Sequence, residues 1–139
     1  MGSISTVTDE EKVYDAIYSI AYDALTQYGL PIYSKDRRKP DVGEPTEYVY
    51  VNQVHDAYKK HTLQPNIYDV PVEFLCEINV THDNIPTGRQ ASKELQRAFH
   101  LKASPHGLVV NDAMATDAET LTGQRFVVSM TLTYTTKMV

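Results

Sequence analysis

The sequence has little that is chemically reactive and little positive charge. Cys76 is the only cysteine in 139 residues, which excludes an internal disulfide and a cluster of thiolates around a metal. Lys and Arg number 13 against 18 acidic residues, for a formal charge of −5. Such a chain is a poor general nucleic-acid binder, because phosphates need a positive surface. It has no apolar run of about 18 residues, so neither a transmembrane segment nor a membrane partner is expected.

The residues that are present fit one folded domain. Hydrophobic residues make up 42% and charged residues 22% of the chain, which excludes a disordered chain, collagen and a coiled coil. The length predicts a single domain over residues 1–139, in which residues 1–8 form a flexible polar lead-in.

Two helices are predicted. Apolar residues recur at helical spacing over 9–28, and Gly29 suits the left-handed position that often follows a helix. A second helix is expected near Thr87, which has the spacing of a capping box with Gln90, and it continues to about Lys102.

The strands are marked by alternation of apolar and polar residues. It is unbroken over 68–81 and clear over 125–134, so each segment is expected to be a long strand covered on one face. Shorter strands are predicted at 48–54 and 108–116. Pro71 cannot donate to a strand ladder, so the start of its strand should lie at an edge or be distorted. The helices need a surface to cover, which predicts a two-layer α+β domain: a mainly antiparallel sheet of about four strands with two helices packed on one face.

The sequence shows no established catalytic or metal-binding pattern. The five histidines lack ligand spacing, and no nucleophile elbow, P-loop or dinucleotide fingerprint is present. Cys76 falls on the apolar face of its strand, where a buried core thiol is expected. We therefore predict no catalytic residues, no cofactor, no metal site and a protein that is not an enzyme.

A row of tyrosines lies along the first helix. Tyr14, Tyr18 and Tyr22 repeat every four residues on the flank of the apolar stripe. They either widen the core face or form a subunit contact, for which tyrosine offers a large area and a hydroxyl group.

Long loops are predicted at 34–47 and 55–66. The first holds a basic group within an acidic chain, which is either a solvated loop or a docking segment for an acidic neighbour. The candidate partner-binding residues in the two loops are Lys35, Arg37, Arg38, Lys39, His55, Tyr58, Lys59 and Lys60.

The polar faces of the two long strands are rich in threonine and carry acids. This face is either an ordinary wetted sheet surface or, in a ring, the lining of a channel through which DNA passes without binding. Its residues are Glu73, Glu77, Asn79, Thr81, Ser129, Thr131 and Thr133, of which Glu73, Glu77, Thr131 and Thr133 are the candidate channel-facing residues.

The whole pattern resembles the tail terminator (tail-completion) proteins of bacteriophages with long non-contractile tails, the siphophages. The resemblance lies in the order and character of segments: a helix ending YDAIYSIAYDALTQYG, the pair Ile32-Tyr33, a charged excursion, and then VPVEFLCEINV, GRQASKELQRAFHL and RFVVSMTLTY. It covers nearly the entire chain.

The resemblance implies a structural role in the virion. Such proteins form hexameric rings that cap the tail tube, stop its growth and present a surface to the head. The implied partners are other copies of the chain, the tail-tube protein and a head-completion or stopper protein, with DNA only passing through. The implied location is the virion tail or neck, after assembly in the cytoplasm of the bacterial host. Alternatives are another neck or tail protein, a small dimeric α+β enzyme or ligand-binding domain, and a module that binds peptides along its edge strand.

Overall fold

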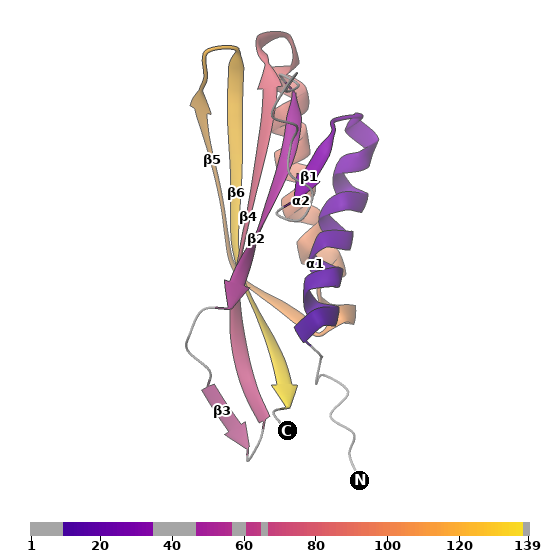
Figure 1. Ribbon diagram of the computed structural model, residues 1–139, viewed down its shortest axis with the longest axis vertical. Coiled ribbons are helices and arrows are strands. Elements are labelled where there is room, and N and C mark those ends of the chain that lie inside the picture. The colour runs from indigo at the N-terminus through magenta and orange to yellow at the C-terminus, as the bar shows by residue number, and fades with distance from the viewer. Residues whose placement is uncertain (1–9, 35–46, 57–60, 65–66, 138–139) are drawn as a thin grey trace.

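The alternating residues form the two longest strands of the structure, a computed structural model that describes residues 10–34, 47–56, 61–64 and 67–137 (Figure 1). The predicted lead-in 1–8 lies outside the described residues, as do residues 35–46 and 57–60 of the predicted loops. The elements are α1 (Glu10–Leu25), β1 (Ile32–Ser34), β2 (Tyr48–Asp56), β3 (His61–Gln64), β4 (Ile67–Thr81), α2 (Ile85–Lys102), β5 (Leu108–Glu119) and β6 (Gly123–Lys137).

The strands form one mixed sheet, and both helices pack on the same face of it (Figure 1). The order across the sheet is β1-β2-β4-β6-β5. Strand β3 pairs with the first residues of β4. All pairings are antiparallel except that of β1 with β2, which is parallel. The predicted two-layer α+β class is confirmed, whereas the expected number of about four strands is too low, because the described part of the chain already forms six.

One strand, β3, falls inside a predicted loop, and another, β1, was not predicted. Strand β3 lies inside the predicted loop 55–66, and β2 extends to Asp56, so that segment is not a single long loop. Both β1 and β3 are too short for alternation to show; they exist because β2 and β4 offer them backbone partners. Strand β5 also continues three residues past its predicted end, to Glu119.

Helix α1 ends as its sequence predicts. A 3₁₀ turn over Thr26–Tyr28 follows it, and Gly29 takes the left-handed conformation with φ of 70°. The Gly29 N–H donates to the Thr26 carbonyl oxygen.

Helix α2 begins earlier than predicted. It starts at Ile85, so Thr87 is inside the first turn and the capping box of Thr87 with Gln90 is wrong. Pro86 sits in this first turn, where its missing N–H is not needed and its fixed φ suits the helix. Asn84 holds the N-cap position, but its side chain makes no capping hydrogen bond.

Pro71 lies between the two strands that flank β4 on one side. Asp56 of β2 pairs with Val72 and His61 of β3 pairs with Asp69, which leaves Pro71 paired only with Thr133 of β6 among the described residues. The start of β4 does not lie at an edge of the sheet, since β3 and β6 pair with it on its two sides, so the expected edge position is wrong. Pro71 instead falls at the break between β3 and β2, where no described residue pairs with it on that side.

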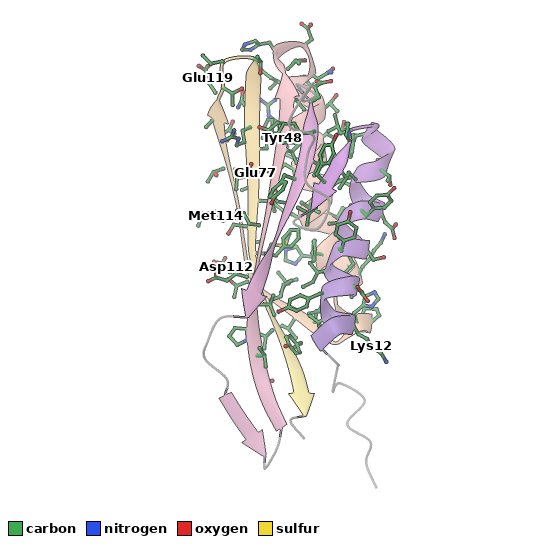
Figure 2. The ribbon with its side chains drawn as sticks, in the orientation of Figure 1. Lys12, Tyr48, Glu77, Asp112, Met114 and Glu119 are labelled. Carbon is green, nitrogen blue, oxygen red and sulfur yellow. The ribbon has the colours of Figure 1, made fainter. Side chains whose placement is uncertain are left out.

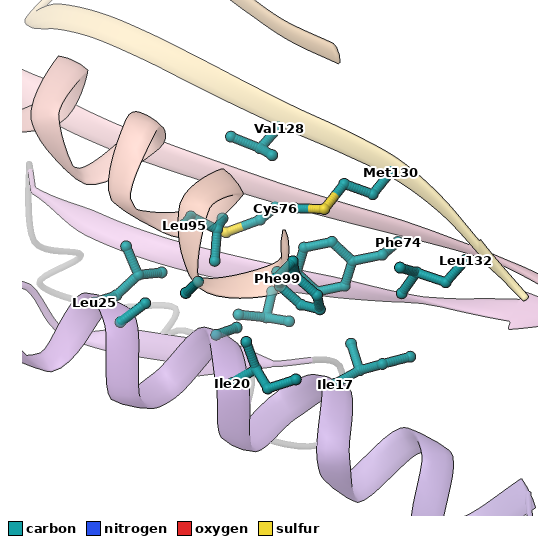
Figure 3. Close-up of a cluster of buried hydrophobic side chains, with 14 of the residues drawn as sticks. Ile17, Ile20, Leu25, Phe74, Cys76, Leu95, Phe99, Val128, Met130 and Leu132 are labelled. Atoms are coloured by element: carbon teal, nitrogen blue, oxygen red, sulfur yellow. The ribbon is translucent and has the colours of Figure 1, made fainter. Parts of the chain in front are cut away.

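The core lies between the helices and the inner face of the sheet (Figure 3). Each of the three central strands contributes its alternate apolar residues, and these are almost completely buried. The main members are Ile17 and Ile20 of α1, Phe74, Cys76 and Ile78 of β4, Leu95 and Phe99 of α2, and Val128, Met130 and Leu132 of β6. Among the described residues, no helix lies on the opposite face of the sheet, which is called the uncovered face below.

Candidate interaction surfaces

The candidate channel residues share the uncovered face of the sheet. Glu73 pairs with Thr131 across β4 and β6, and Glu77 pairs with Val127. Glu73 is exposed, whereas Glu77, Thr131 and Thr133 are half-buried. The strands thus bring these side chains onto one surface, and their role as a channel lining stays a prediction.

Asn79 lies on the uncovered face of the sheet, as its position in the alternation predicts, but it is not wetted there. It is only 7% exposed, and its Oδ1 accepts a hydrogen bond of 3.0 Å from Arg125 Nε. Its Nδ2 is buried and has no hydrogen-bond partner among the described residues. The Arg125 side chain, which also lies 4.0 Å from Glu77 Oε2, shows that long polar residues on this face cover one another.

The uncovered face also carries a row of aromatic residues that the sequence analysis missed. Tyr33 of β1 pairs with Tyr50 of β2, and Tyr48 pairs with Asn79 of β4, so the three tyrosines share this face. The Tyr33 and Tyr48 rings meet edge to face with centroids 6.3 Å apart. Tyr48 and Glu77, both labelled in Figure 2, lie on the neighbouring strands β2 and β4. In the sequence, Tyr48 and Tyr50 alternate with Val49, and this alternation indicates that the two tyrosines share the face opposite the core.

The tyrosines of α1 widen the core face, as one of the two expected roles requires, and their role in a subunit contact stays a prediction. Tyr14 and Tyr18 are half-buried and pack against the core, whereas Tyr22 is 43% exposed. The Tyr18 and Tyr22 rings stack with centroids 6.1 Å apart. The row therefore widens the core at one end and presents aromatic surface at the other.

The predicted docking residues lie mostly outside the described residues. This holds for Lys35, Arg37, Arg38, Lys39, Tyr58, Lys59 and Lys60. His55 lies in β2 and not in a loop.

A second basic group, which the sequence analysis missed, lies on α2. Arg89, Lys93 and Arg97 are all exposed, and their spacing of four residues places them on one side of the helix. This spacing can be read from the sequence and was the signal for the group.

Cys76 is a core residue, as predicted. It is fully buried, and burial together with the nearby Glu77 charge raises the pKa of its thiol well above the usual range. Burial thus favours the neutral thiol, the state expected of a cysteine that packs in a core. Among the described residues no group of three or more His, Cys, Asp and Glu side chains is placed to hold a metal ion.

A depression of about 660 Å³ lies where β5 begins. Its polar side chains bond one another: Thr135 Oγ1 donates to Asp69 Oδ1 at 2.7 Å, and Asn111 Nδ2 donates to Thr133 Oγ1. Four of the polar side chains that line the depression are thus already hydrogen-bonded in pairs.

Glu47 ties the start of β2 to the turn between β4 and α2. Its Oε2 accepts hydrogen bonds from Asn84 Nδ2 at 2.7 Å, from the Thr81 backbone N–H at 3.1 Å and from Thr81 Oγ1 at 3.1 Å. The Asn84 bond, followed by the Thr81 N–H, lowers the pKa of the Glu47 carboxyl. The carboxylate thus fixes the turn from which α2 starts.

Replacement of Glu47 by glutamine is expected to lower the free energy of unfolding by about 1–2 kcal/mol at pH 7, because charged acceptors make the stronger hydrogen bonds. A lowered folded-state pKa gives stability that is present above the ordinary glutamate pKa and disappears as pH falls through the lowered value. Urea unfolding at a series of pH values should therefore show wild type and Glu47→Gln converging in acid. The exposed Glu73→Gln is the control, and an equal effect there would contradict this role for Glu47.

Two comparisons with known proteins were negative. Neither a scan against protein-family models nor a search of curated proteins finds a match to this chain. None of the described helices is both long and apolar enough to cross a membrane.

Proposed function

We propose that the chain is a subunit of a ring of the siphophage tail-terminator type, with a structural and not a catalytic role. In this proposal the ring caps the tail tube, stops its polymerisation and offers the surface on which the head is joined. Its location is the tail or neck of the virion.

The observation that carries the proposal is the division of the sheet into different surfaces. One face is covered by α1 and α2, and the other is uncovered, with threonines and the acids Glu73 and Glu77. The sheet also ends in an unpaired strand on each side, β1 and β5, among the described residues. A ring subunit needs such opposite contact surfaces, and a channel for DNA suits a face with negative charge and little lysine.

Deletion of the gene from a phage that encodes the chain tests the proposal. Loss of a terminator leaves tube growth unchecked, so electron microscopy of the lysate should show tails of abnormal length. Tails of normal length beside heads that leak DNA would instead indicate a stopper protein of the neck, and fully normal particles would contradict both roles.

The same deletion strain tests the docking segment. Complementation with Arg37→Glu and Arg38→Glu should give folded protein but at least about a tenfold loss of joined particles, since reversal turns attraction to an acidic neighbour into repulsion. Joined and unjoined particles are counted in micrographs. The matched variant, Arg89→Glu with Lys93→Glu, changes the charge equally on α2. Normal joining by the first variant would contradict docking through 34–47.

A further inference from the structure

Strand β5 is exposed far more than the other long strands. It pairs with β6 on one side, and among the described residues no strand pairs with its other side. After Leu108 every residue of β5 is exposed or half-buried, with Val109 60% and Met114 58% exposed. Figure 2 shows Asp112, Met114 and Glu119 along this margin of the sheet, on the side away from Lys12 of α1. A strand held by a single neighbour is a template for pairing with another chain.

The hairpin between β5 and β6 shows which backbone groups of β5 are free. The Thr120 N–H donates to the Gly123 carbonyl oxygen at 2.9 Å, so this pair is hydrogen-bonded. In an antiparallel ladder hydrogen-bonded and non-hydrogen-bonded pairs alternate. Counted from Thr120, the non-hydrogen-bonded pairs are those of Ala113, Ala115, Asp117 and Glu119. The N–H and C=O groups of these residues therefore point away from β6, toward the open margin of the sheet.

At the opposite margin of the sheet, strand β1 runs in the direction that antiparallel pairing with β5 requires. Strand β1 runs parallel to β2, and each further step from β2 to β4, β6 and β5 reverses the strand direction. Hence β5 runs antiparallel to β1. Copies related by rotation about an axis along the strands keep their strand directions, so β5 of one copy would meet β1 of the next in an antiparallel pairing.

Charge favours this contact over pairing of β5 with itself. The strand carries Asp112, Asp117 and Glu119 and no basic residue, and like charges across a strand pair are destabilising. Strand β1 is the uncharged sequence Ile32-Tyr33-Ser34, and in the sequence basic residues follow it directly. An acidic strand is therefore better matched by β1 than by a second β5.

We propose that β5 of one subunit pairs antiparallel with β1 of a second copy of the chain, as a head-to-tail contact. The inference deepens the proposed function and rests on it for the closure of the ring. The contact joins the sheets of successive copies, with all helices on one side and all uncovered faces on the other.

Cysteine cross-linking tests which strands meet. Met114 of β5 and Tyr33 of β1 both point to the uncovered face, at opposite margins of the sheet. Four strand spacings of about 4.8 Å put them about 19 Å apart within one chain, too far for a disulfide. Oxidation, or a short bis-maleimide, should link Met114→Cys/Tyr33→Cys into covalent multimers and leave each single variant without a covalent link between copies. Efficient dimers of Met114→Cys alone would indicate β5–β5 pairing and overturn the proposal.

A proline on the free side of β5 tests the backbone bonds. Ala115→Pro removes an outward N–H without removing a bond to β6, and should weaken self-association about tenfold per contact in light scattering across a dilution series. Ala115→Ser keeps the N–H and should associate like wild type. Protection of the buried Cys76 thiol from a thiol reagent checks that each variant is folded, and Arg89→Glu should leave the mass unchanged.

The results separate this contact from the role in the phage. Equal association of the Ala115→Pro and Ala115→Ser variants, or a wild-type chain that stays monomeric at its highest soluble concentration, would overturn the contact. Normal particles after gene deletion would overturn the proposed function and leave a measured β5–β1 contact standing, since association is measured on the purified chain.

Discussion

Replacement of Gly123 by alanine should destabilise the protein by about 3 kcal/mol or more, a large share of the roughly 5–15 kcal/mol that holds a domain folded. Gly123 opens β6 and pairs with Thr81 at the end of β4. A Cβ atom there would lie 1.8 Å from the Val80 carbonyl oxygen and 2.7 Å from Thr81 Cα. Both are backbone atoms, so no side-chain rotation relieves the clash and the two longest strands must move apart.

Cys76 provides the measurement for this variant. Its thiol is fully buried in the wild-type fold and becomes reactive only when the core opens, so labelling rates and urea unfolding together report stability. Gly29→Ala is the control: Gly29 has φ of +70° and no heavy atom within 4 Å of an added Cβ, so only backbone strain of about 1–2 kcal/mol is expected. If Gly123→Ala costs no more than Gly29→Ala, the close approach does not constrain the fold.

The requirement for glycine at position 123 could not be predicted from the sequence. The alternation over 68–81 and 125–134 predicts two long strands and their inner faces, because a period of two is a property of each strand alone. The clash at Gly123 depends on the register between β4 and β6, which no local pattern contains. Strand β1 was missed for a related reason, since three residues show no period and pairing with β2 makes them a strand.

The candidate surfaces, too, were predictable only where they follow from the alternation within a single strand. That Glu73 and Thr131 share an uncovered face follows from their positions in alternating segments, and the register of β4 and β6 confirms it. The burial of Asn79 could not be predicted, because Arg125 lies far away in the sequence and covers it only across the strand pair. The open margin of β5 also needed the topology, since the sequence of a strand does not say how many neighbours it has.

Replacement of Phe99 by alanine should cost about 3–5 kcal/mol, the range for removing a large aromatic side chain from a core. Phe99 is 0% exposed on α2, and its ring centroid lies 5.0 Å from that of Phe74 on β4, with 47° between the ring planes. The side chain thus attaches the helix layer to the middle of the sheet (Figure 3). Its loss leaves a cavity on both layers at once, and urea unfolding followed by circular dichroism measures the effect.

Further variants decide whether the contact between Phe99 and Phe74 or helix α2 itself accounts for the loss of stability in Phe99→Ala. Leu101→Ala lies two residues further along α2 at 65% exposure, and it should change stability by no more than about 0.5 kcal/mol. A double-mutant cycle of Phe99→Leu with Phe74→Leu isolates the aromatic pair, for which a coupling of about 0.5–1.5 kcal/mol is expected. A coupling of zero would mean that the two rings contribute only by filling volume. Equal losses for Phe99→Ala and Leu101→Ala would show that α2 is not held to the sheet through its buried face.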